Sequence, residues 1–421
     1  MAQKGIRECT AKEMIERLLP KYGFKIESKC VLADSENSLE KLAKENPWLK
    51  KEKLVVKPDM LFGKRGKQKL ILLNANFSEA VEFLKKNLGK TIEIKNKLGK
   101  LTHFIVEPFV LHEQKQEMYV AMKTERNYDV IYFSLEGGIE VEENWDKVIE
   151  IHIPVLEKSN AKKLLEKKFP EFNEKNKSIE FISALYSFFA DLNYAYLELN
   201  PFVVKDNSVF VLDTVAKLDD TGMFESGKQW NLNEFPESFG ETMTEEEKYI
   251  KSLDEKSGSS LKLKILNPEG RIWTMVAGGG ASVIYADTIV DLGYGKEMAN
   301  YGEYSGDPST DETFEYAKTL LDLMTRKKHS KGKVLLIGGG IANFTDVAKT
   351  FTGIIMALQK YAEKLREHKI RVYVRRGGPN YEVGLDKIRK AVEEINVPIK
   401  VFGPETHMTK IVPMAVKEVI E

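Results

Sequence analysis

Cysteine is scarce in this sequence, and neither sign of charge is in excess. Only two cysteines occur among 421 residues, Cys9 and Cys30, and their spacing is not that of a metal site. This scarcity argues against a disulfide framework or a zinc site and is typical of a reducing compartment. Lys+Arg and Asp+Glu both total 64, so the net charge indicates neither nucleic acid nor an acidic membrane as a partner.

Long apolar runs are also missing. No stretch approaches the roughly twenty apolar residues that a membrane span needs. The start, MAQKGIRECTAKEM, lacks the apolar run that follows the charges of a secretory signal. We therefore expect a cytoplasmic protein. Hydrophobic residues make up 42% of the chain, as in globular proteins, and its length exceeds what one core usually serves, so we expect two domains.

The composition changes after Phe235. The part before it mixes strands and helices, and its first helix is predicted over residues 10–22, with Thr10 as a possible cap. The stretch PESFGETMTEEEKYIKSLDEKSGSS that follows is acidic and polar, which is typical of a linker or a surface helix. We expect a first domain over residues 1–245, a linker over 246–260 and a second domain over 261–421.

From residue 271 onward, a strand, a glycine-containing turn and a helix follow one another three times. The copies begin RIWTMVAGGG, KVLLIGGG and RVYVRRGG, and PIKVFG is a last strand. Repeats of this size predict an α/β fold with a parallel sheet and right-handed crossovers. We expect a Rossmann- or flavodoxin-like domain.

Lys57 lies in the predicted strand LVVKPD, before a loop in which two glycines accompany three cations, LFGKRGK. A lysine on a strand can hold a fixed charge against a nucleotide phosphate, and such a loop can close over that phosphate. Taken alone, a hairpin turn with solvated lysines explains the loop more simply. No G-x-x-x-x-G-K-[ST] sequence occurs, which excludes a P-loop.

Polar residues interrupt the apolar strands YLELNPFVV and SVFVLDTVAK. Folding these strands about the turn at residues 205–207 sets Asn200 almost opposite Asp213, and Glu198 shares a face with Asn200. Oxygen ligands of this kind suit Mg²⁺, which often bridges protein and phosphates. The alternative is an edge hairpin whose polar residues face water. We favour magnesium, because burying acids between such apolar strands without a cation would be costly.

Three strand-to-helix turns of the second half carry small or polar residues. They are Gly278-Gly279-Gly280, Gly338-Gly339-Gly340 with Asn343 and Thr345, and Arg375-Arg376-Gly377-Gly378. In a parallel sheet such turns gather at the carboxyl ends of the strands, where helix N-termini favour anions. Each turn alone is more often a packing device or a helix cap. Their recurrence in one sheet, with two arginines, favours a pocket for a polyanionic acid.

Four motifs follow one another in the first half: KEMIERLLPKYG, LVVKPDMLFGKRGK, LELNPFVV and FVLDTVAK. In this order they resemble the ATP-grasp half of succinyl-CoA synthetase β subunits. The resemblance implies an ATP-grasp fold with phosphate contacts from Lys57, Arg65 and Gly66 and with magnesium at Asn200 and Asp213. The other ATP contacts that it implies are Pro108 and Val110 for the adenine and Glu117 for the ribose.

The second half carries the motifs GRIWTMVAGGGASVIYADTI, ANYGEYSGDPS, GGGIANFTDVAKTF, VRRGGPNYEVGL and VFGPETHMT. They resemble the amino-terminal portion of ATP-citrate lyase, or its smaller subunit where that enzyme is split between two genes. Ordinary succinyl-CoA synthetase β subunits lack the Asn-Phe-Thr and Arg-Arg-Gly-Gly-Pro-Asn-Tyr elements, so citrate is favoured over succinate. The citrate contacts implied are Ser305, Gly306, Asn343, Phe344, Thr345, Tyr361 and Arg376. A structural cation is implied near Asp254 and Ser257.

A partner is expected from what the chain lacks. None of its six histidines lies in a glycine-rich loop suited to phosphorylation, and no CoA-binding domain is evident. The resemblance implies a hetero-oligomer in which a second subunit, with succinyl-CoA synthetase α-like and citryl-CoA lyase modules, supplies the phosphohistidine and most of the CoA site. ATP with Mg²⁺ would phosphorylate that histidine while Lys57 and Arg65 stabilise charge. Citrate would then take the phosphoryl group, and CoA would give citryl-CoA, which is cleaved to acetyl-CoA and oxaloacetate. The chain alone is expected to be inactive.

Other interpretations stay open. One is the corresponding subunit of a stand-alone citryl-CoA synthetase, and another is a succinyl-CoA synthetase β-like ligase. A third is a non-catalytic module that senses citrate and nucleotide. Asn200 and Asp213 count against a sensor, because a sensor needs no metal-bridged phosphates.

Overall fold

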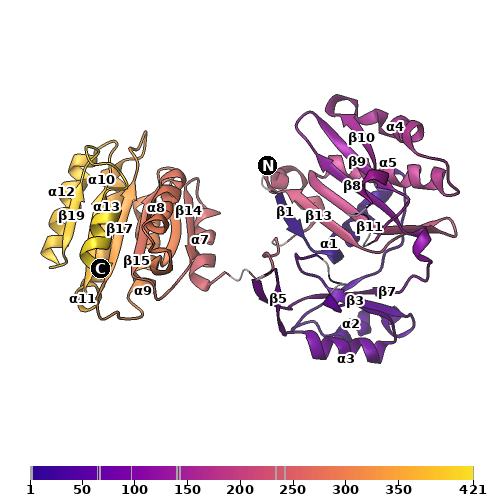
Figure 1. Cartoon of the computed structure of the whole chain (residues 1–421), viewed down its shortest axis with the longest axis horizontal. Helices are drawn as coiled ribbons and strands as arrows, with labels where there is room; N and C mark the ends of the chain where they lie inside the picture. Colours follow the sequence, from indigo (N-terminus) through magenta and orange to yellow (C-terminus); the bar gives the residue numbers. More distant parts are fainter. Residues whose placement is uncertain are drawn as a thin grey trace. The chain divides into compact units, whose positions relative to one another are not determined.

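The chain forms two compact units in a computed structural model (Figure 1). The structure describes residues 3–63, 65, 68–95, 97–138, 141, 144–232, 235–240 and 243–420. The first unit ends at residue 241 and the second begins at residue 242.

The larger sheet of the first unit has seven strands in the order β1-β13-β11-β8-β9-β10, with β12 paired to β11, and its neighbouring strands are antiparallel. These strands are β1 (Gln3–Ile6), β8 (Met118–Thr124), β9 (Tyr128–Ser134), β10 (Ile149–Pro154), β11 (Tyr194–Lys205), β12 (Ser208–Val211) and β13 (Thr214–Asp219). One face packs against α1 (Glu8–Leu18), α4 (Ala161–Lys168), α5 (Lys175–Asp191) and α6 (Met223–Trp230).

Strand alternation assigns the two faces of this sheet different roles. Leu197 and Leu199 of β11 enter the core beneath the helices. Tyr196, Glu198 and Asn200 point to the opposite face and are only half-buried. The polar residues of the predicted magnesium site therefore lie on the face that the core does not use.

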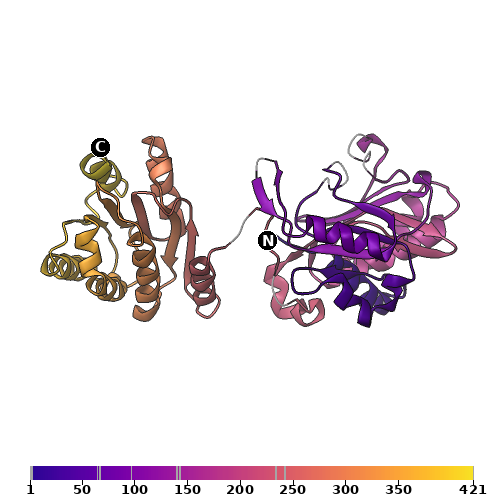
Figure 2. The same ribbon diagram turned by 90° about the horizontal axis from the view of Figure 1, so that it is seen from below.

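The smaller sheet of the first unit has the order β2-β7-β3-β4 and is antiparallel. Its strands are β2 (Val31–Ala33), β3 (Leu54–Pro58), β4 (Leu72–Ala75) and β7 (Phe104–Pro108). Helices α2 (Leu39–Glu45) and α3 (Phe77–Asn87) cover its outer face and fill its core, as Figures 1 and 2 show. Strands β5 (Thr91–Ile94) and β6 (Lys97–Lys100) form a separate ribbon.

Helix α1 begins two residues before the predicted cap. Thr10 lies inside the helix, and the residue at the N-cap position, Arg7, makes no side-chain cap. Instead Asp59, just after β3, accepts hydrogen bonds from the backbone N–H groups of Glu8 (2.7 Å) and Cys9 (3.0 Å). The carboxylate satisfies the free donors of the first turn and suits its positive dipole end. The cap prediction was wrong because the capping group comes from a distant segment.

The second unit contains a six-stranded sheet in the order β14-β16-β15-β17-β18-β19. Its strands are β14 (Ser260–Ile265), β15 (Ile272–Ala277), β16 (Asn300–Ser305), β17 (Lys333–Gly339), β18 (Ile370–Arg375) and β19 (Ile399–Phe402). All neighbours are parallel except the edge strand β14, which runs antiparallel to β16. The predicted parallel sheet is confirmed.

Helices lie on both sides of this sheet (Figure 2). One side carries α7 (Glu245–Asp254), α9 (Thr310–Met324), α10 (Val347–Lys360), α11 (Ala362–Glu367) and α12 (Tyr381–Glu394), and the other carries α8 (Gly279–Asp291) and α13 (Ile411–Ala415). Two-sided coverage explains why the central strands β15 and β17 are buried along their whole length.

The predicted linker is corrected by α7. Residues 246–260 do not connect two domains but form this helix and the turn that leads into β14. Thr244 and Glu247 close a capping box at the start of α7, and Ile250 is fully buried in the second core. The acidic composition belongs to the exposed side of an amphipathic helix.

No helix among the described residues combines the length and the apolar character that crossing a bilayer requires.

Candidate functional site

Lys57 lies at the centre of a buried charge cluster in the first unit. Its Nζ is 2.7 Å from Glu8 Oε1 and 3.0 Å from Glu107 Oε1, and it donates to the Leu212 carbonyl at 2.6 Å. Lys12 contacts the same acids, at 2.8 Å from Glu8 and 2.5 Å from Glu107. Strand β3 supplies Lys57, β7 supplies Glu107 and α1 supplies the other two, so the cluster joins the four-stranded sheet to the helix that packs on the seven-stranded sheet.

Arg65 extends this cluster to Asp213. Its Nη2 lies 2.8 Å from Glu8 Oε2 and donates to a carboxylate oxygen of Asp213, while Nη1 donates to the Pro58 carbonyl at 2.8 Å. Arg65 is buried, so the loop is not a turn of solvated cations at this position. The cation that pairs with Asp213 in this structure is Arg65. The neighbouring Gly66, the third predicted phosphate contact, lies outside the described residues.

The electrostatics of the cluster converge on Glu8. Burial alone would raise the pKa of its carboxyl group, but Lys12, Lys57 and Arg65 outweigh burial and hold that pKa well below the ordinary value. Against the effect of burial, Glu107 and then Glu8 raise the pKa of Lys12, and Asp213 and then Glu8 raise the pKa of Arg65. Glu8, Lys12 and Arg65 therefore stay charged at neutral pH. Glu8 also contacts both predicted phosphate contacts, Lys57 and Arg65.

Asn200 and Asp213 are adjacent, as predicted. The Asn200 backbone N–H donates to the Asp213 carbonyl at 3.0 Å. The side-chain oxygen of Asn200 accepts from the Gly138 N–H at 2.7 Å and keeps a second lone pair. Asp213 is one-third exposed and uses one carboxylate oxygen for Arg65 among the described contacts. Hard oxygen donors with remaining capacity on one face fit Mg²⁺.

The residues predicted around the adenosine also lie together. Pro108 is the last residue of β7. In the segment that follows, the His112 ring contacts both the Val110 carbonyl (2.7 Å) and a Glu117 oxygen (3.0 Å), so it links these two residues. Gly138 packs against Glu117, and a Cβ at this glycine would lie 2.6 Å from the Glu117 carboxylate. Since Gly138 also donates to Asn200, this turn joins the predicted ribose and magnesium positions.

In the second unit the two predicted arginines have different roles. Arg375 is fully used by the backbone, because it donates to the carbonyls of Thr406, Gly339 and Pro404 at 2.8, 2.9 and 3.1 Å. Arg376 is equally buried, but among the described residues it makes one hydrogen bond, to the Gly340 carbonyl at 2.8 Å, and its Nε has no partner there. Burial and then Arg375 lower the pKa of Arg376. An incompletely satisfied buried cation is suited to an anionic ligand.

Two neighbouring residues, Gly339 and Tyr304, leave room and a hydrogen-bond donor beside the Arg376 guanidinium. A Cβ at Gly339 would lie 2.8 Å from Arg376 Nη1, so any larger residue there would displace the guanidinium. Tyr304, at the carboxyl end of β16, is buried, and its hydroxyl has no hydrogen-bond partner in the part of the chain that the structure describes. Burial raises the pKa of Tyr304 to about 12, although the nearby Arg376 opposes this shift. The hydroxyl is therefore available as a neutral donor beside the guanidinium.

The predicted citrate residues fall into two groups. Most follow the carboxyl ends of β16, β17 and β18, where the topology brings strand ends to one edge. They are Ser305, Gly306, Asn343, Phe344, Thr345 and Arg376. Asp346 caps α10, so neither Asn343 nor Thr345 acts as the cap of this helix. Neither of these two side chains has a hydrogen bond within the described part of the chain. Phe344 is 69% exposed.

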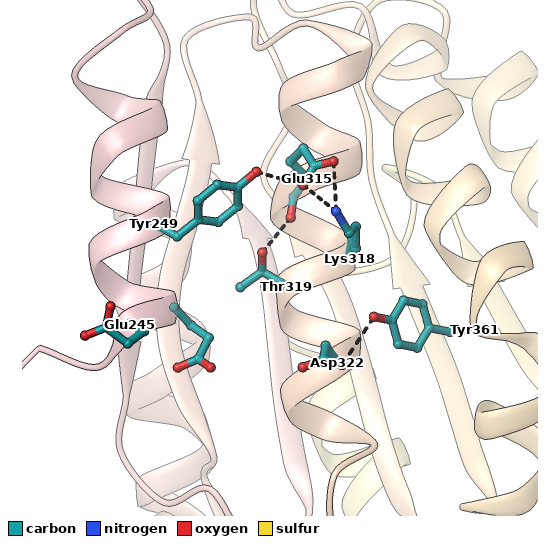
Figure 3. Close-up of a pocket in the computed structure, with 8 residues that line it drawn as sticks. Glu245, Tyr249, Glu315, Lys318, Thr319, Asp322 and Tyr361 are labelled. Atoms are coloured by element: carbon teal, nitrogen blue, oxygen red, sulfur yellow. Dashed lines mark hydrogen bonds and ion pairs between the residues drawn. The ribbon is translucent and has the colours of Figure 1, made fainter.

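Tyr361 does not belong with these residues. It follows α10, whose 14 residues separate it from the β17 turn by about 21 Å. Its hydroxyl contacts Asp322 at 3.4 Å in a groove of about 350 Å³ between α7, α9 and α10 (Figure 3). Glu245, Glu246 and Glu315 also line this groove. The placement of Tyr361 with the other citrate contacts is therefore corrected, because helix length carries it to the opposite end of the unit.

The predicted structural cation near Asp254 and Ser257 remains a prediction. Asp254 accepts from the Leu261 N–H at 2.7 Å and pairs with Lys262 at 2.5 Å. The Ser257 hydroxyl lies 2.6 Å from that of Ser259. Each side chain thus has its own partner, and Lys262 supplies a positive charge beside Asp254.

Several site residues escaped the sequence argument: Glu8, Lys12, Asp59, Glu107, His112 and Tyr304. A signal existed for some of them. Glu8 and Lys12 are four residues apart on the apolar side of α1, and Glu107 interrupts the apolar strand FIVEPFV. Charges at such positions indicate a buried ionic network. Nothing local indicated Asp59 or Tyr304, whose roles depend on distant segments.

Comparisons with known proteins cover both units. A family model described as the ATP-citrate synthase ATP-grasp domain matches residues 2–230, and one described as ATP citrate lyase citrate-binding matches residues 241–418. The ATP-grasp fold expected for the first unit is thereby confirmed. An ATP-citrate synthase alpha chain of Arabidopsis thaliana is 47% identical over 423 residues, 99% of each chain. Human ATP-citrate synthase is 45% identical over 99% of this chain, which spans 38% of that protein.

A solved structure agrees with these relatives. The ATP citrate lyase of Methanothrix soehngenii, determined in complex with citrate and coenzyme A, matches with a TM-score of 0.91 and 52% sequence identity over 99% of this chain and 100% of that chain. Because two family models and relatives of full length match the chain nearly from end to end, it belongs to the ATP-citrate synthase family, also called ATP-citrate lyase.

Proposed function

We propose that this chain is the ATP- and citrate-binding subunit of an ATP-citrate lyase, with nucleotide in the first unit and citrate at the carboxyl edge of the second sheet. The observation that carries the citrate site is Arg376, a buried guanidinium with an unpartnered Nε. Asn343 and Thr345 add uncommitted polar groups from the neighbouring turn. The complex of the Methanothrix soehngenii enzyme with citrate and coenzyme A supports this assignment.

Arg376 can recognise a carboxylate by charge-assisted hydrogen bonds, and Tyr304 can donate beside it. Asn343 and Thr345 can bind further carboxylate or hydroxyl groups of a tricarboxylic acid. The free N–H groups at the start of α8, after Gly278, favour negative charge at the same edge. Several donors that converge on one polyanion explain a preference for citrate over an acid with fewer such groups.

In the first unit, Lys57 and Arg65 would bind the phosphates, and Pro108, Val110 and Glu117 would bind the adenosine. Both cations are paired to Glu8, which fixes their positions. A preorganised positive charge stabilises the charge that develops during phosphoryl transfer without further rearrangement.

Asn200 and Asp213 would hold Mg²⁺, and the ion would neutralise phosphate charge. Asp213 is paired with Arg65 in this structure. Binding of the metal and the phosphates would replace this pair with two pairs of opposite charge, Asp213 with the metal and Arg65 with a phosphate.

A partner subunit with the phosphorylated histidine, the CoA site and the citryl-CoA cleaving module completes the proposed enzyme as a hetero-oligomer. The chain spans 38% of the human protein, which leaves room for these functions in the rest of that protein. The chain by itself should bind both ligands without turning them over.

The test is calorimetric titration of the isolated chain with citrate and with succinate, followed by Mg-ATP. We expect citrate to bind, succinate to bind at least about tenfold more weakly, and Mg-ATP to bind with either acid present. Succinate binding with no response to citrate would contradict the proposal. Adding a partner subunit then separates the two enzymes: acetyl-CoA formation supports a complete lyase, and accumulation of citryl-CoA identifies a stand-alone synthetase.

A further inference from the structure

The two cysteines of the chain meet next to the charge cluster. Cys9 lies in the first turn of α1 and is buried, whereas Cys30 lies just before β2 and is half-buried. Their sulfur atoms are 2.7 Å apart, and Cys30 Sγ is also 3.6 Å from the Cys9 carbonyl oxygen. Residues 21 positions apart are thus brought to a distance at which a bond needs little movement.

We propose that Cys9 and Cys30 form a reversible disulfide, a modification site that ties the start of α1 to the segment before β2. The bonded distance is about 2.05 Å, well under 1 Å from the observed separation. Two thiolates on one tetrahedral zinc ion would have to move apart to about 3.8 Å, given Zn–S bonds of about 2.3 Å. The carboxylate of Glu13, 3.8 Å from Cys9 Sγ, could complete a metal site, but the sulfur separation favours the covalent bond.

The order of reaction follows from exposure. A small-molecule disulfide such as oxidised glutathione reaches half-buried Cys30 first. The Cys30 thiolate attacks one sulfur of the reagent, and the other sulfur leaves as a thiolate that takes up a proton. Cys9 then loses its proton and attacks Cys30 Sγ, which expels the second thiol. The two protein thiols give up two electrons and two protons, and the reagent disulfide becomes two thiols. Hydrogen bonding to Cys30 and burial raise the pKa of Cys9, which agrees with its role as the second group.

The location couples this bond to nucleotide binding, an inference that rests on the proposed function. Helix α1 packs on the seven-stranded sheet, and β2 belongs to the four-stranded sheet. The backbone N–H of Cys9 donates to Asp59, and the preceding residue, Glu8, contacts both Lys57 and Arg65. Arg65 must release Asp213 when metal and phosphates bind. A cross-link between the two sheets beside this cluster restricts that rearrangement, so the oxidised chain should bind nucleotide more weakly.

The experiment incubates the full chain with oxidised glutathione and reads the intact mass, the free thiols and the cross-linked tryptic peptide. We expect loss of two hydrogen atoms, disappearance of both free thiols and a peptide that joins Cys9 to Cys30, all reversed by dithiothreitol. Cys9→Ser should instead retain glutathione on Cys30. Cys30→Ser should remain largely unmodified, because Cys9 is buried.

Calorimetry then compares ADP affinity before and after oxidation. We expect a decrease of about tenfold in the oxidised chain, no change in Cys30→Ser treated in the same way, and unchanged citrate affinity. Glutathione adducts without a cross-link, a disulfide between two chains, or a purified protein whose thiols hold zinc would overturn the proposal. Equal ADP affinity in both redox states would refute the coupling but not the bond. Failure to bind ADP in either state would instead contradict the proposed function.

Discussion

At the residue scale, the site of the first unit depends on side chains that position other side chains by ion pairs. Lys57 and Arg65 are the predicted phosphate contacts, and Glu8 pairs with both of them. In the second unit Arg375 serves the backbone, and Arg376 keeps an unpartnered nitrogen. Of these two adjacent arginines, Arg375 therefore has a structural role and Arg376 a binding role.

Replacing Glu8 by Gln tests the cluster. The change leaves Lys12, Lys57 and Arg65 buried without their shared counter-charge, and the first unit should lose about 3–5 kcal/mol of unfolding free energy at neutral pH. Urea unfolding followed by a probe in that unit measures the loss.

The pH dependence of this loss has a definite sign. The pKa of Glu8 is lowered by folding, so its stabilisation is complete above its ordinary value of 4.5 and disappears as the pH falls through the folded-state value. The stability difference between the native chain and Glu8→Gln should therefore shrink from neutral pH towards about pH 3. A difference that stays constant over this range would show that Glu8 is not held ionised by the cluster.

At the element scale, α1 is positioned by a carboxylate from another strand segment. Because Asp59 caps its first turn, the helix start, the cluster and the end of β3 form one structural unit. The glycine turns after β15, β17 and β18 act similarly, since they let backbone and arginine side chains approach at the sheet edge.

Asp59→Ala should destabilise the first unit by about 1–2 kcal/mol, because two N–H donors lose their acceptor. Thr10→Ala is the matched control and should change stability by less than about 0.5 kcal/mol, since Thr10 is an interior helical residue. Thermal unfolding of the two variants distinguishes them. If Thr10→Ala proved the more harmful, the helix would start where the sequence predicted.

At the scale of the whole molecule, the two units carry separate binding sites, and each should fail separately. Asp213→Asn should abolish ATP turnover in the enzyme assembled with its partner while citrate affinity stays within about twofold.

Arg376→Gln should weaken citrate binding about 10- to 100-fold, the value of charge-assisted hydrogen bonds, and leave nucleotide affinity unchanged. Calorimetry on the isolated chain and turnover on the assembled enzyme measure both. Equal loss of both ligands in either variant would contradict the separation.

Local patterns sufficed for much of this protein. Strand alternation, glycine turns and helical periodicity depend on neighbours along the chain, so they predicted the parallel sheet and the apposition of Asn200 and Asp213, which a hairpin brings together. The long motifs predicted the family for the same reason, since each is one continuous segment.

Contacts between distant segments could be decided only by the folded structure. Arg65 and Asp213 are 148 positions apart, and Asp59 caps a helix that begins 51 residues earlier. The backbone carbonyls around the two arginines decided that Arg376 rather than Arg375 keeps a nitrogen without a partner among the described residues. Helix length removed Tyr361 from the citrate residues, and folding brought two unrelated cysteines into contact. Charge pairing and desolvation depend on which surfaces meet, and no local pattern of residues encodes that choice.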